Sequence, residues 1–432
     1  NNEIYRNAFE WRFEFPEVLD NEGNFMGFDV VIGNPPYQLV TDNKFKSYYT
    51  NTFKNSEGKA DLYRFFIEQG HYILKDAFYF SFIVPSSILN IPACKKLRSF
   101  ILNRNKLLEI INFWGAVFSE ASVNSIILMT EKNQKSDKIK IIDDRSEIPT
   151  PESLDFAVKD QKYVDAKFWK ENRNNQFKIN VKNKEYEILN KIENKSKKLN
   201  KLCKYTLGLQ VYHNSIHDNK VIKHRKYHSK NKEDSTFFPE VTGHQISRFY
   251  FDKNFKEYVS YGDWCYNKPP WEFCSENRIL IREITSTKGL VCTITNSINI
   301  PNKAIIIVIP LQLNAEYVLG ILNSNLINFF VKKGTEKGIQ RLFPRVSLST
   351  IAELPIYSPN KEEEFNLKQV VNKIIHQKQQ DPTADTSTLE AEIDRMVYDL
   401  YGLTEEEREI VEEGVDSPSR TPNLPINNRD RL

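Results

Sequence analysis

The stretch GFDVVIGNPPY, residues 27–37, decides the fold of the first part of this 432-residue chain. Its FDVVI segment is a short, continuous apolar run, as is typical of a buried strand in a parallel sheet. Gly33 follows directly and permits a sharp turn, so the next residues emerge at the carboxyl end of the strand. Open α/β sheets bind their ligands at that end. We therefore predict a strand that ends in a ligand-binding turn.

The sequence around this stretch predicts an α/β domain over residues 1–135. Apolar residues at helical spacing favour a helix over residues 61–75, although Gly70 interrupts it, and a second helix is expected over 93–105. Because strands alternate with helices, we predict a parallel, doubly wound sheet. Its further strands are expected over 78–84, 107–113 and 124–129.

The turn of Asn34, Pro35, Pro36 and Tyr37 has the chemistry to hold an exocyclic amine. The amine of a purine is a poor nucleophile because its lone pair is delocalised into the ring. Two acceptors aimed at the NH2 group, the Asn34 amide oxygen and the Pro35 carbonyl, favour a pyramidal nitrogen with a localised lone pair. Proline fixes φ and carries no N–H, so the turn is stiff, and Tyr37 offers a flat face to an extruded base. A Pro-Pro turn without chemistry is the alternative interpretation.

The rest of the chain changes in composition several times. The strand-like runs after residue 200 alternate with Pro, Asn, Ser and Trp, and one helix is expected over residues 315–332. Loop-rich, polar segments of this kind suit recognition. Gly402 is expected to end a helix, and the spacing of Thr404 and Glu407 is that of a capping box. We predict a bridging segment over 136–200, an α+β domain over 201–360, a helical segment over 361–416 and a mobile tail over 417–432.

The net charge of +3 is a sum that conceals one strongly basic and one strongly acidic region. Between Gln161 and Lys230 there are 18 Lys or Arg residues and 6 Asp or Glu residues. Between Lys361 and Asp416 there are 6 basic and 16 acidic residues. A basic block in folded sequence is typical of an anion-binding surface, with nucleic acid the usual partner, although a solvated Lys-rich helix would have the same composition.

Composition also excludes several classes of protein. Hydrophobic residues make up 40% and aromatic residues 12%, which excludes disorder over most of the length. The longest aliphatic run, AIIIVI at residues 304–309, is far shorter than the roughly 20 residues of a membrane helix. The five cysteines form no C-x-x-C pair, so we expect reduced thiols and a cytoplasmic location.

The first domain resembles a known family at these motifs. FEWRFEFPEV at residues 9–18, followed by residues 27–37, is similar to the fourth methylase motif of the type IIG restriction-modification enzymes, which are gamma-class N6-adenine DNA methyltransferases. DLYRFFIE at 61–68 and FIVPSS at 82–87 resemble their fifth and sixth motifs. Val117-Phe118 resembles the eighth, so the resemblance implies that Phe118 stacks on a flipped adenine opposite Tyr37. It implies a partial Rossmann-like methyltransferase fold and double-stranded DNA as the partner.

The second domain resembles the TaqI-like specificity domain, which reads the target sequence. Four stretches carry this resemblance, and EIDRMVYDLYGLT at residues 392–404 is similar to the helical tail common in these enzymes. The four stretches are NRILIREI at 277–284, GILNSNLI at 320–327, FPR at 343–345 and LPI at 354–356.

A methyltransferase needs S-adenosylmethionine, usually held at a Gly-rich turn, and the sequence contains no G-x-G. The family places that motif before NPPY, where only 33 residues precede it here. We therefore expect the cofactor motif, and a nuclease with its Mg²⁺, in upstream segments of the same polypeptide. The first residue is Asn1, and we interpret the chain as a fragment that does not methylate DNA alone.

Candidate DNA contacts are basic residues of the second domain. His213 and His217, like His224 and His228, have the spacing of metal ligands on a helix, but their polar and basic neighbours argue against a metal, and we predict none. Protein glutamine N5-methyltransferases also carry NPPY, and a non-catalytic DNA specificity module is the third interpretation. The predicted DNA contacts are Lys223, Arg225, Lys268, Arg278, Arg282, Arg341 and Arg345, each of which could equally be a surface charge or a structural ion pair.

Overall fold

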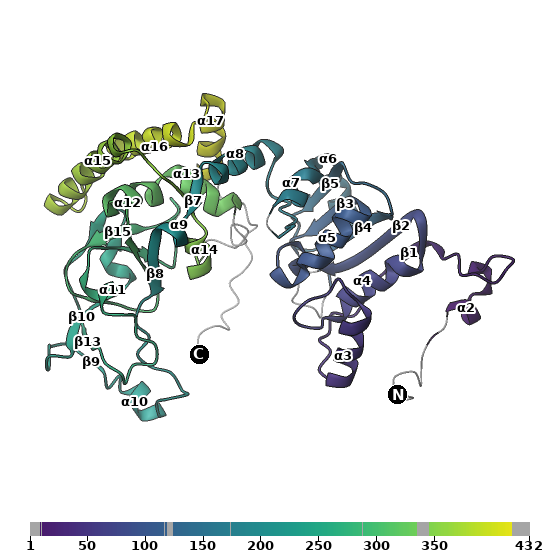
Figure 1. Cartoon of the computed structure of the whole chain (residues 1–432), viewed down its shortest axis with the longest axis horizontal. Coiled ribbons are helices and arrows are strands. Elements are labelled where there is room, and N and C mark those ends of the chain that lie inside the picture. Colours follow the sequence, from purple (N-terminus) through teal and green to yellow (C-terminus); the bar gives the residue numbers. More distant parts are fainter. Residues whose placement is uncertain are drawn as a thin grey trace. The chain divides into compact units, whose positions relative to one another are not determined.

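The structure is a computed structural model that describes residues 9, 11–115, 117–118, 124–172, 174–286, 288–334 and 345–416. It divides into two compact units, with the boundary between Asn183 and Lys184 (Figure 1). The boundary falls inside the segment predicted to bridge two domains. Residues 138–171 extend the first unit, whereas nearly all of α8 (Asn183–Asn194) belongs to the second.

The first unit is built on one six-stranded sheet in the order β1-β2-β4-β3-β5-β6. The parallel pairs are β1 with β2 and β3 with β5, whereas β4 runs antiparallel to both of its neighbours and β6 runs antiparallel to β5. The strands are β1 (Phe28–Gly33), β2 (Leu74–Pro85), β3 (Asn105–Phe113), β4 (Ser125–Lys132), β5 (Lys138–Asp144) and β6 (Lys162–Asp165).

The mixed sheet confirms the α/β class but corrects the prediction of a wholly parallel sheet. Only residues 114–124 join β3 to β4, which is shorter than the crossover that a parallel pair needs. The chain therefore turns back, and β4 lies between β2 and β3. The apolar pattern of residues 124–129 predicts a strand but carries no information on its direction.

Two helices of the first unit, α4 and α5, lie close to the positions predicted over 61–75 and 93–105, whereas its other helices were not predicted. Asp42 caps α3 by accepting from two backbone N–H groups, and Thr150 closes a capping box on α6. The helices are α2 (Trp11–Glu14), α3 (Asn43–Thr52), α4 (Leu62–Ile73), α5 (Lys95–Arg104), α6 (Pro151–Lys159) and α7 (Ala166–Glu171), with short 3-10 turns at Pro16–Val18, Ser86–Leu89 and Pro92–Cys94.

Helix α4 packs tightly on one face of the sheet, and Gly70 makes this possible. A Cβ atom at Gly70 would lie 2.6 Å from the Phe80 ring and 3.4 Å from Val31 Cγ1. The next residue, His71, hydrogen-bonds to Thr130 Oγ1 at 2.9 Å and is buried, which lowers its pKa to about 4. The glycine that interrupts the predicted helical face therefore marks the closest approach of helix and sheet.

The opposite face of β1 and β2 is bare of described elements. Val30, Ile32 and Tyr79 are 57%, 78% and 49% exposed, and Val30 pairs with Tyr79 across the two strands. On its side away from β2, β1 pairs with none of the described strands. The first unit therefore presents an open sheet edge with an apolar strip beside it.

The second unit contains the predicted α+β domain. A four-stranded antiparallel sheet, β15-β14-β17-β8, carries a core that includes Leu280, Ile305 and Ile307. A second sheet has the order β16-β10-β13-β9, and two pairs, β11-β12 and β7-β18, complete the unit.

The elements of this part of the chain are short. They are β7 (Ser196–Lys198), α9 (Leu199–Leu202), β8 (Cys203–Leu207), α10 (Asn219–Lys223), β9 (His228–Ser229), β10 (Phe237–Val241), a 3-10 turn at Gly243–Gln245, β11 (Ile246–Ser247), β12 (Tyr250–Phe251), β13 (Tyr258–Ser260), α11 (Glu272–Ser275), β14 (Arg278–Arg282), β15 (Cys292–Thr295), β16 (Ile300–Pro301), β17 (Ile305–Pro310), α14 (Leu348–Ala352) and β18 (Pro355–Tyr357).

The single helix predicted over residues 315–332 is three shorter segments. These are α12 (Ala315–Asn323), α13 (Asn325–Phe329) and a π-helical turn (Phe330–Gly334). Ser324 is extended, and its hydroxyl accepts from the Ile327 N–H, so it ends one helix and caps the next. Asn323 exchanges two hydrogen bonds with the backbone of Cys292 on β15, which fixes the break against the sheet.

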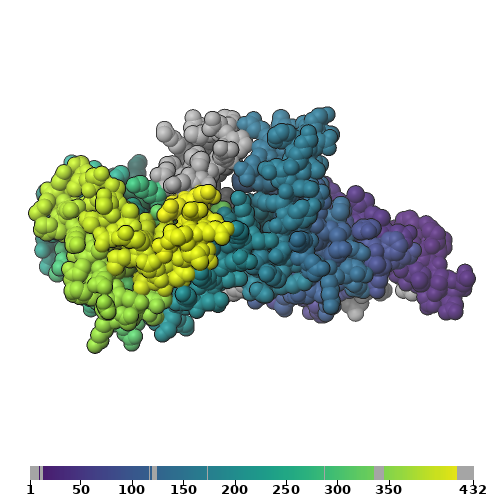
Figure 2. All heavy atoms as spheres, turned by 90° about the horizontal axis from the view of Figure 1, so that it is seen from above, coloured from purple at the N-terminus to yellow at the C-terminus, as the bar shows by residue number. Residues whose placement is uncertain are grey.

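The acidic C-terminal segment is helical, as predicted. It forms α15 (Lys361–Gln380), α16 (Ser387–Tyr401) and α17 (Glu405–Asp416), which make one continuous yellow-green surface in Figure 2. Gly402 adopts a left-handed conformation with φ of 65° at the end of α16. Thr404 and Glu407 exchange the two hydrogen bonds of a capping box, so both predicted helix signals are confirmed.

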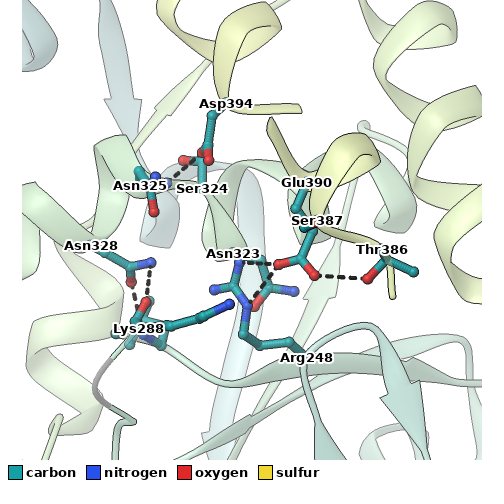
Figure 3. A network of polar contacts seen from close by, with 12 residues as sticks. Arg248, Lys288, Asn323, Ser324, Asn325, Asn328, Thr386, Ser387, Glu390 and Asp394 are labelled. Carbon is teal, nitrogen blue, oxygen red and sulfur yellow. Dashed lines mark hydrogen bonds and ion pairs between the residues drawn. The ribbon is translucent and has the colours of Figure 1, made fainter. Parts of the chain in front are cut away.

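A polar network fastens these helices to the rest of the second unit (Figure 3). Arg248 donates to Glu390 Oε2 at 2.9 Å, and Thr386 donates to the other oxygen of the same carboxylate. Asp394 accepts from the Asn325 N–H at 2.6 Å, at the start of α13. Burial raises the pKa of Asp394 to about 6, and the neighbouring carboxylates of Glu390 and Glu412 add to the shift.

The described residues contain neither a membrane-spanning helix nor a disulfide. None of their helices combines the length and apolar character needed to cross a bilayer. All five cysteines lie within the described ranges, and each is a buried free thiol.

Asp394→Asn is expected to change the pH dependence of stability. Because the folded-state pKa of about 6 exceeds the ordinary value of 3.8, the folded protein holds its proton more tightly, and the free energy of unfolding falls as pH rises from about 4 to beyond 6. The asparagine keeps an acceptor for the Asn325 N–H and should flatten that fall. Urea titrations between pH 4 and 7 measure it. Glu409→Gln, at an exposed position of α17, is the control, and an unchanged slope in Asp394→Asn would contradict the assignment.

Gly70→Ala is expected to destabilise the first unit. Alanine favours a helix by about 1 kcal/mol over glycine, but overpacking against Phe80 costs about 1–3 kcal/mol. We expect a net loss of about 1 kcal/mol or more in urea unfolding. Lys46→Ala, at an exposed position of α3, should be close to neutral, and a stabilised Gly70→Ala variant would show that the helix has room to move.

Candidate functional site

The NPPY turn lies at the carboxyl end of β1, as the sequence predicts. Gly33 pairs with Phe82 of β2, and a Cβ atom at this position would approach the Phe82 ring to 3.2 Å. In the turn itself Pro35 is buried and Tyr37 is half-buried, whereas Asn34 and Pro36 are exposed. The turn is therefore anchored through alternate residues and presents the Asn34 amide to solvent.

Tyr37 ties the turn to the neighbouring strand. Its hydroxyl donates to the Ile83 carbonyl of β2 at 2.9 Å, and burial raises the pKa of the hydroxyl, which keeps it a neutral donor. The ring meets Tyr63 edge to face, with the centroids 6.3 Å apart. Tyr63 is buried, and its hydroxyl lies 3.6 Å from Cys94 Sγ, so the Tyr63 ring is also fixed.

Two acceptors of the turn are available to a ligand. Among the described residues, neither the Asn34 side chain nor the Pro35 carbonyl takes part in a hydrogen bond. The turn continues into backbone hydrogen bonds from Leu62 N to Gln38 O and from Val40 N to Ala60 O, each 2.9 Å long. The acceptors thus sit on a segment fixed at both ends.

A buried carboxylate organises the segment between α3 and α4. Glu68 is fully buried and accepts from the N–H groups of Lys54 and Asn55 and from the Tyr72 hydroxyl. Arg64, on the same helix, donates to the carbonyls of Glu57 and Lys59. Beyond the resemblance of DLYRFFIE to the fifth methylase motif, the sequence gives no signal for these contacts of Arg64 and Glu68.

Phe118 is half-buried in the connection between β3 and β4, and residues 116 and 119–123 around it lie outside the described ranges. The start of this connection is firmly held. Trp114 Nε1 donates to Asp143 Oδ1 at 2.6 Å, and the Trp114 N–H donates to the Asp144 carbonyl. Because β3 and β1 are both parallel to β2, Trp114, which directly follows β3, lies at the same end of the sheet as the NPPY turn. Nothing in the motif pattern indicated Trp114 or Asp143.

The predicted DNA contacts fall into different environments. Arg278 is fully buried, and its guanidinium donates to the carbonyls of Glu276, Ser297 and Asn299 and to the Asn299 side chain. Burial lowers its pKa to about 10. The prediction that Arg278 contacts DNA is therefore corrected to a structural role, because its hydrogen bonds join β14 to the 297–299 loop.

The remaining basic residues are nearer the surface. Arg225 makes a bidentate ion pair with Glu257, and Lys268 pairs with Asp263. Lys223 on α10 and Arg345 are exposed, and Arg282 is half-buried. Arg341 lies outside the described residues. None of the His, Cys, Asp and Glu side chains that the structure describes gather in a group of three or more that could hold a metal ion.

Comparison with known proteins finds family matches for two segments of the chain. Residues 1–118 match the Eco57I restriction-modification methylase family, and residues 238–356 match the TaqI-like C-terminal specificity domain. These matches confirm the resemblances read from the sequence.

Two curated relatives are similar over different lengths. RM.MjaORFECS2P of Methanocaldococcus jannaschii, whose name assigns it to the type II restriction enzymes and methyltransferases, is 26% identical over 407 residues, which are 91% of this chain and 32% of that protein. The type II restriction enzyme and methyltransferase RM.Eco57I of Escherichia coli is 33% identical over 112 residues, 24% of this chain and 11% of that protein. The chain thus spans about a third of the length of the first relative.

A solved structure supports the fold. The type IIL restriction-modification enzyme MmeI, determined in complex with DNA, aligns with a TM-score of 0.56 and 14% identity, over 94% of this chain and 58% of that one. At this identity the likeness concerns the fold alone.

Tyr37→Phe is expected to weaken the anchoring of the turn. Removing the hydroxyl deletes the hydrogen bond to the Ile83 carbonyl, which should lower the free energy of unfolding of the first unit by about 1 kcal/mol. Urea unfolding followed by circular dichroism measures the change. Tyr79→Phe, in which an exposed hydroxyl on β2 is removed, is the matched control and should be neutral. Equal stabilities of the two variants would show that the Tyr37 bond contributes nothing.

Proposed function

We propose that this chain, which carries an Eco57I-type methylase segment and a TaqI-like specificity segment, is the adenine-binding part of a site-specific DNA N6-adenine methyltransferase of a restriction-modification system. One observation carries the proposal above all. The two acceptors of the NPPY turn make no hydrogen bond with any described residue, and they lie at the carboxyl ends of the strands on a turn that Tyr37 fixes to β2. An amine donor is the complement of such a pair.

The chemistry of the turn follows from its geometry. An extruded adenine would donate the two hydrogens of its amine to Asn34 Oδ1 and to the Pro35 carbonyl. Both bonds favour a tetrahedral nitrogen, whose lone pair is then no longer conjugated with the ring and could attack the methyl group of a sulfonium donor. The C–S bond of the donor would break as the N–C bond forms, and the methylated nitrogen would then release one of its two protons. Asn34 and Pro35 thus act as orienting acceptors, and no covalent intermediate with the enzyme is required.

Aromatic side chains would hold the base itself. Tyr37 is fixed through its hydroxyl and leaves its ring to the base, and Phe118 belongs to the connection that begins at the same end of the sheet. Stacking between two rings would compensate for the energy lost when the adenine leaves the duplex.

S-adenosylmethionine would supply the methyl group, but the residues of this chain do not form its main site. The sequence has no Gly-rich strand-to-helix turn, whereas β1 offers an open edge beside the exposed Val30, Ile32 and Tyr79. We propose that the cofactor-binding strands pair with this edge and cover the strip. This would place the methyl donor beside the carboxyl end of β1, where the amine is held.

The second unit favours DNA over a protein substrate. A glutamine N5-methyltransferase would use the same turn on an amide nitrogen, but it offers no reason for a specificity segment over residues 238–356. We propose double-stranded DNA as the partner of the second unit, with Lys223, Arg282 and Arg345 as the contacts that remain accessible.

Transfer of tritiated methyl groups tests the proposal. The chain alone is expected to give no transfer from S-adenosylmethionine to duplex DNA. Joined to a polypeptide that supplies the cofactor-binding strands, it should give N6-methyladenine, and Asn34→Ala should lower the rate about a hundredfold, as when one positioned polar contact is removed. Asn103→Ala, at an exposed position of α5, is the matched control. Label in a protein glutamine, or turnover by the chain alone, would contradict the proposal.

A further inference from the structure

The second unit has an aromatic and basic lobe at the end opposite its acidic helices. We define this lobe as residues 211–232 and 261–268, which include α10 and β9. In Figure 1 it lies at the far end of the unit from α15, α16 and α17. Residues 211–232 precede the segment that matches the TaqI-like specificity domain, so that match assigns them no role.

Aromatic rings are stacked on the surface of the lobe. His213 lies against Tyr266 with centroids 4.0 Å apart and an interplanar angle of 13°, and Tyr227 stacks with Trp264 at 6.0 Å and 23°. Trp264 and Tyr266 nevertheless remain 37% and 42% exposed. Large aromatic side chains that stay partly in water are typical of binding surfaces.

Trp264 is held in place from several sides. A Cβ atom at Gly262 would lie 2.3 Å from its ring, so only glycine allows the backbone to approach so closely. The ring of His217 lies beside Tyr227, and its Nε2 hydrogen-bonds to the Trp264 carbonyl at 3.0 Å. A side chain fixed before binding loses little conformational entropy when a partner arrives.

The charge of the lobe identifies the partner. Between Val211 and Lys232 there are six Lys or Arg residues and one acidic residue, Asp218. Arg225 is paired with Glu257, but Lys220 and Lys223, both exposed on α10, make no ion pair with any described residue. Unpaired lysines next to exposed rings suit a polyanion that also has apolar surface.

We propose that this lobe binds the sugar-phosphate backbone of duplex DNA and adds affinity that does not depend on sequence. Lys220 and Lys223 contact phosphates, and Trp264 packs on the deoxyribose beside them. The proposal rests on the proposed function, since it extends the DNA surface of the second unit from the specificity segment, which contains residues 261–268, to residues 211–232 that precede it. The lobe thereby supports binding, whereas other residues read the bases.

Binding of the 432-residue chain to fluorescent duplex DNA, followed by anisotropy at several salt concentrations, tests this inference. Each phosphate contact contributes about 0.9 to the slope of log K against log salt, so the double variant Lys220→Ala/Lys223→Ala should reduce that slope by about 1.8. The double variant should lose the same amount of binding affinity on duplexes of random sequence as on duplexes that contain the recognition sequence. Trp264→Ala should weaken binding about tenfold, in the range of aromatic contacts to nucleic acid, and Trp264→Phe should weaken it less.

Matched controls come from the acidic helices. Lys361→Ala/Lys373→Ala removes two exposed lysines there, and Phe365→Ala removes an aromatic ring that is 57% exposed; neither should alter binding. An unchanged slope in Lys220→Ala/Lys223→Ala would overturn the inference. Tighter binding of single-stranded DNA that depends on Trp264 would also overturn it, in favour of a base-stacking surface. Methyl transfer by the completed enzyme is measured separately, so failure of the proposed function is distinguishable.

Discussion

The parallel pairing of β1 with β2 sets the position of every group in the candidate site. Because Gly33 lies opposite Phe82, the residues that follow it come to lie beside Ile83, whose carbonyl receives the Tyr37 hydroxyl. The same strand β2 pairs with β4, which brings Ser125 to the same edge opposite Pro85. A shift of one residue in this register would turn the Val31 side of β1 away from α4, and the turn would lose its anchor.

Local signals in the sequence predicted several elements of the fold, but not α3, α6, β5 or β6, and they predicted the arrangement of the elements less well. The strand, glycine and proline of residues 28–36 specify a turn by their own conformational limits, and Gly402 and Thr404 specify a helix end in the same way. The direction of β4 depends on the length of a connection and on pairing with distant strands. At Ser324 the sequence allows two structures. A serine can lie inside a continuous helix, or its hydroxyl can cap a new one, and the contact of Asn323 with β15 favours the second structure.

The site residues also fall into two groups: those that a local motif predicts and those that only the tertiary structure brings together. Asn34 and Tyr37 belong to a contiguous motif, so the sequence contains their arrangement. Arg278 is a predicted DNA contact, but it begins the RILIR strand, whose neighbours are buried on both faces, and four acceptors surround it. Trp114 and Asp143 are 29 residues apart, and only the pairing of β3 with β5 joins them. No spacing rule in a single sequence could identify that contact.

The open edge of β1 has a consequence for handling the chain. A strand edge that no described strand pairs with, beside the exposed Val30 and Ile32, is a template on which a further extended strand can add. Nothing in that geometry distinguishes the strands of a completed enzyme from the same edge of another copy. Prepared by itself and concentrated, the chain is therefore prone to associate edge to edge, and its colloidal behaviour will depend on protein concentration before any ligand is added.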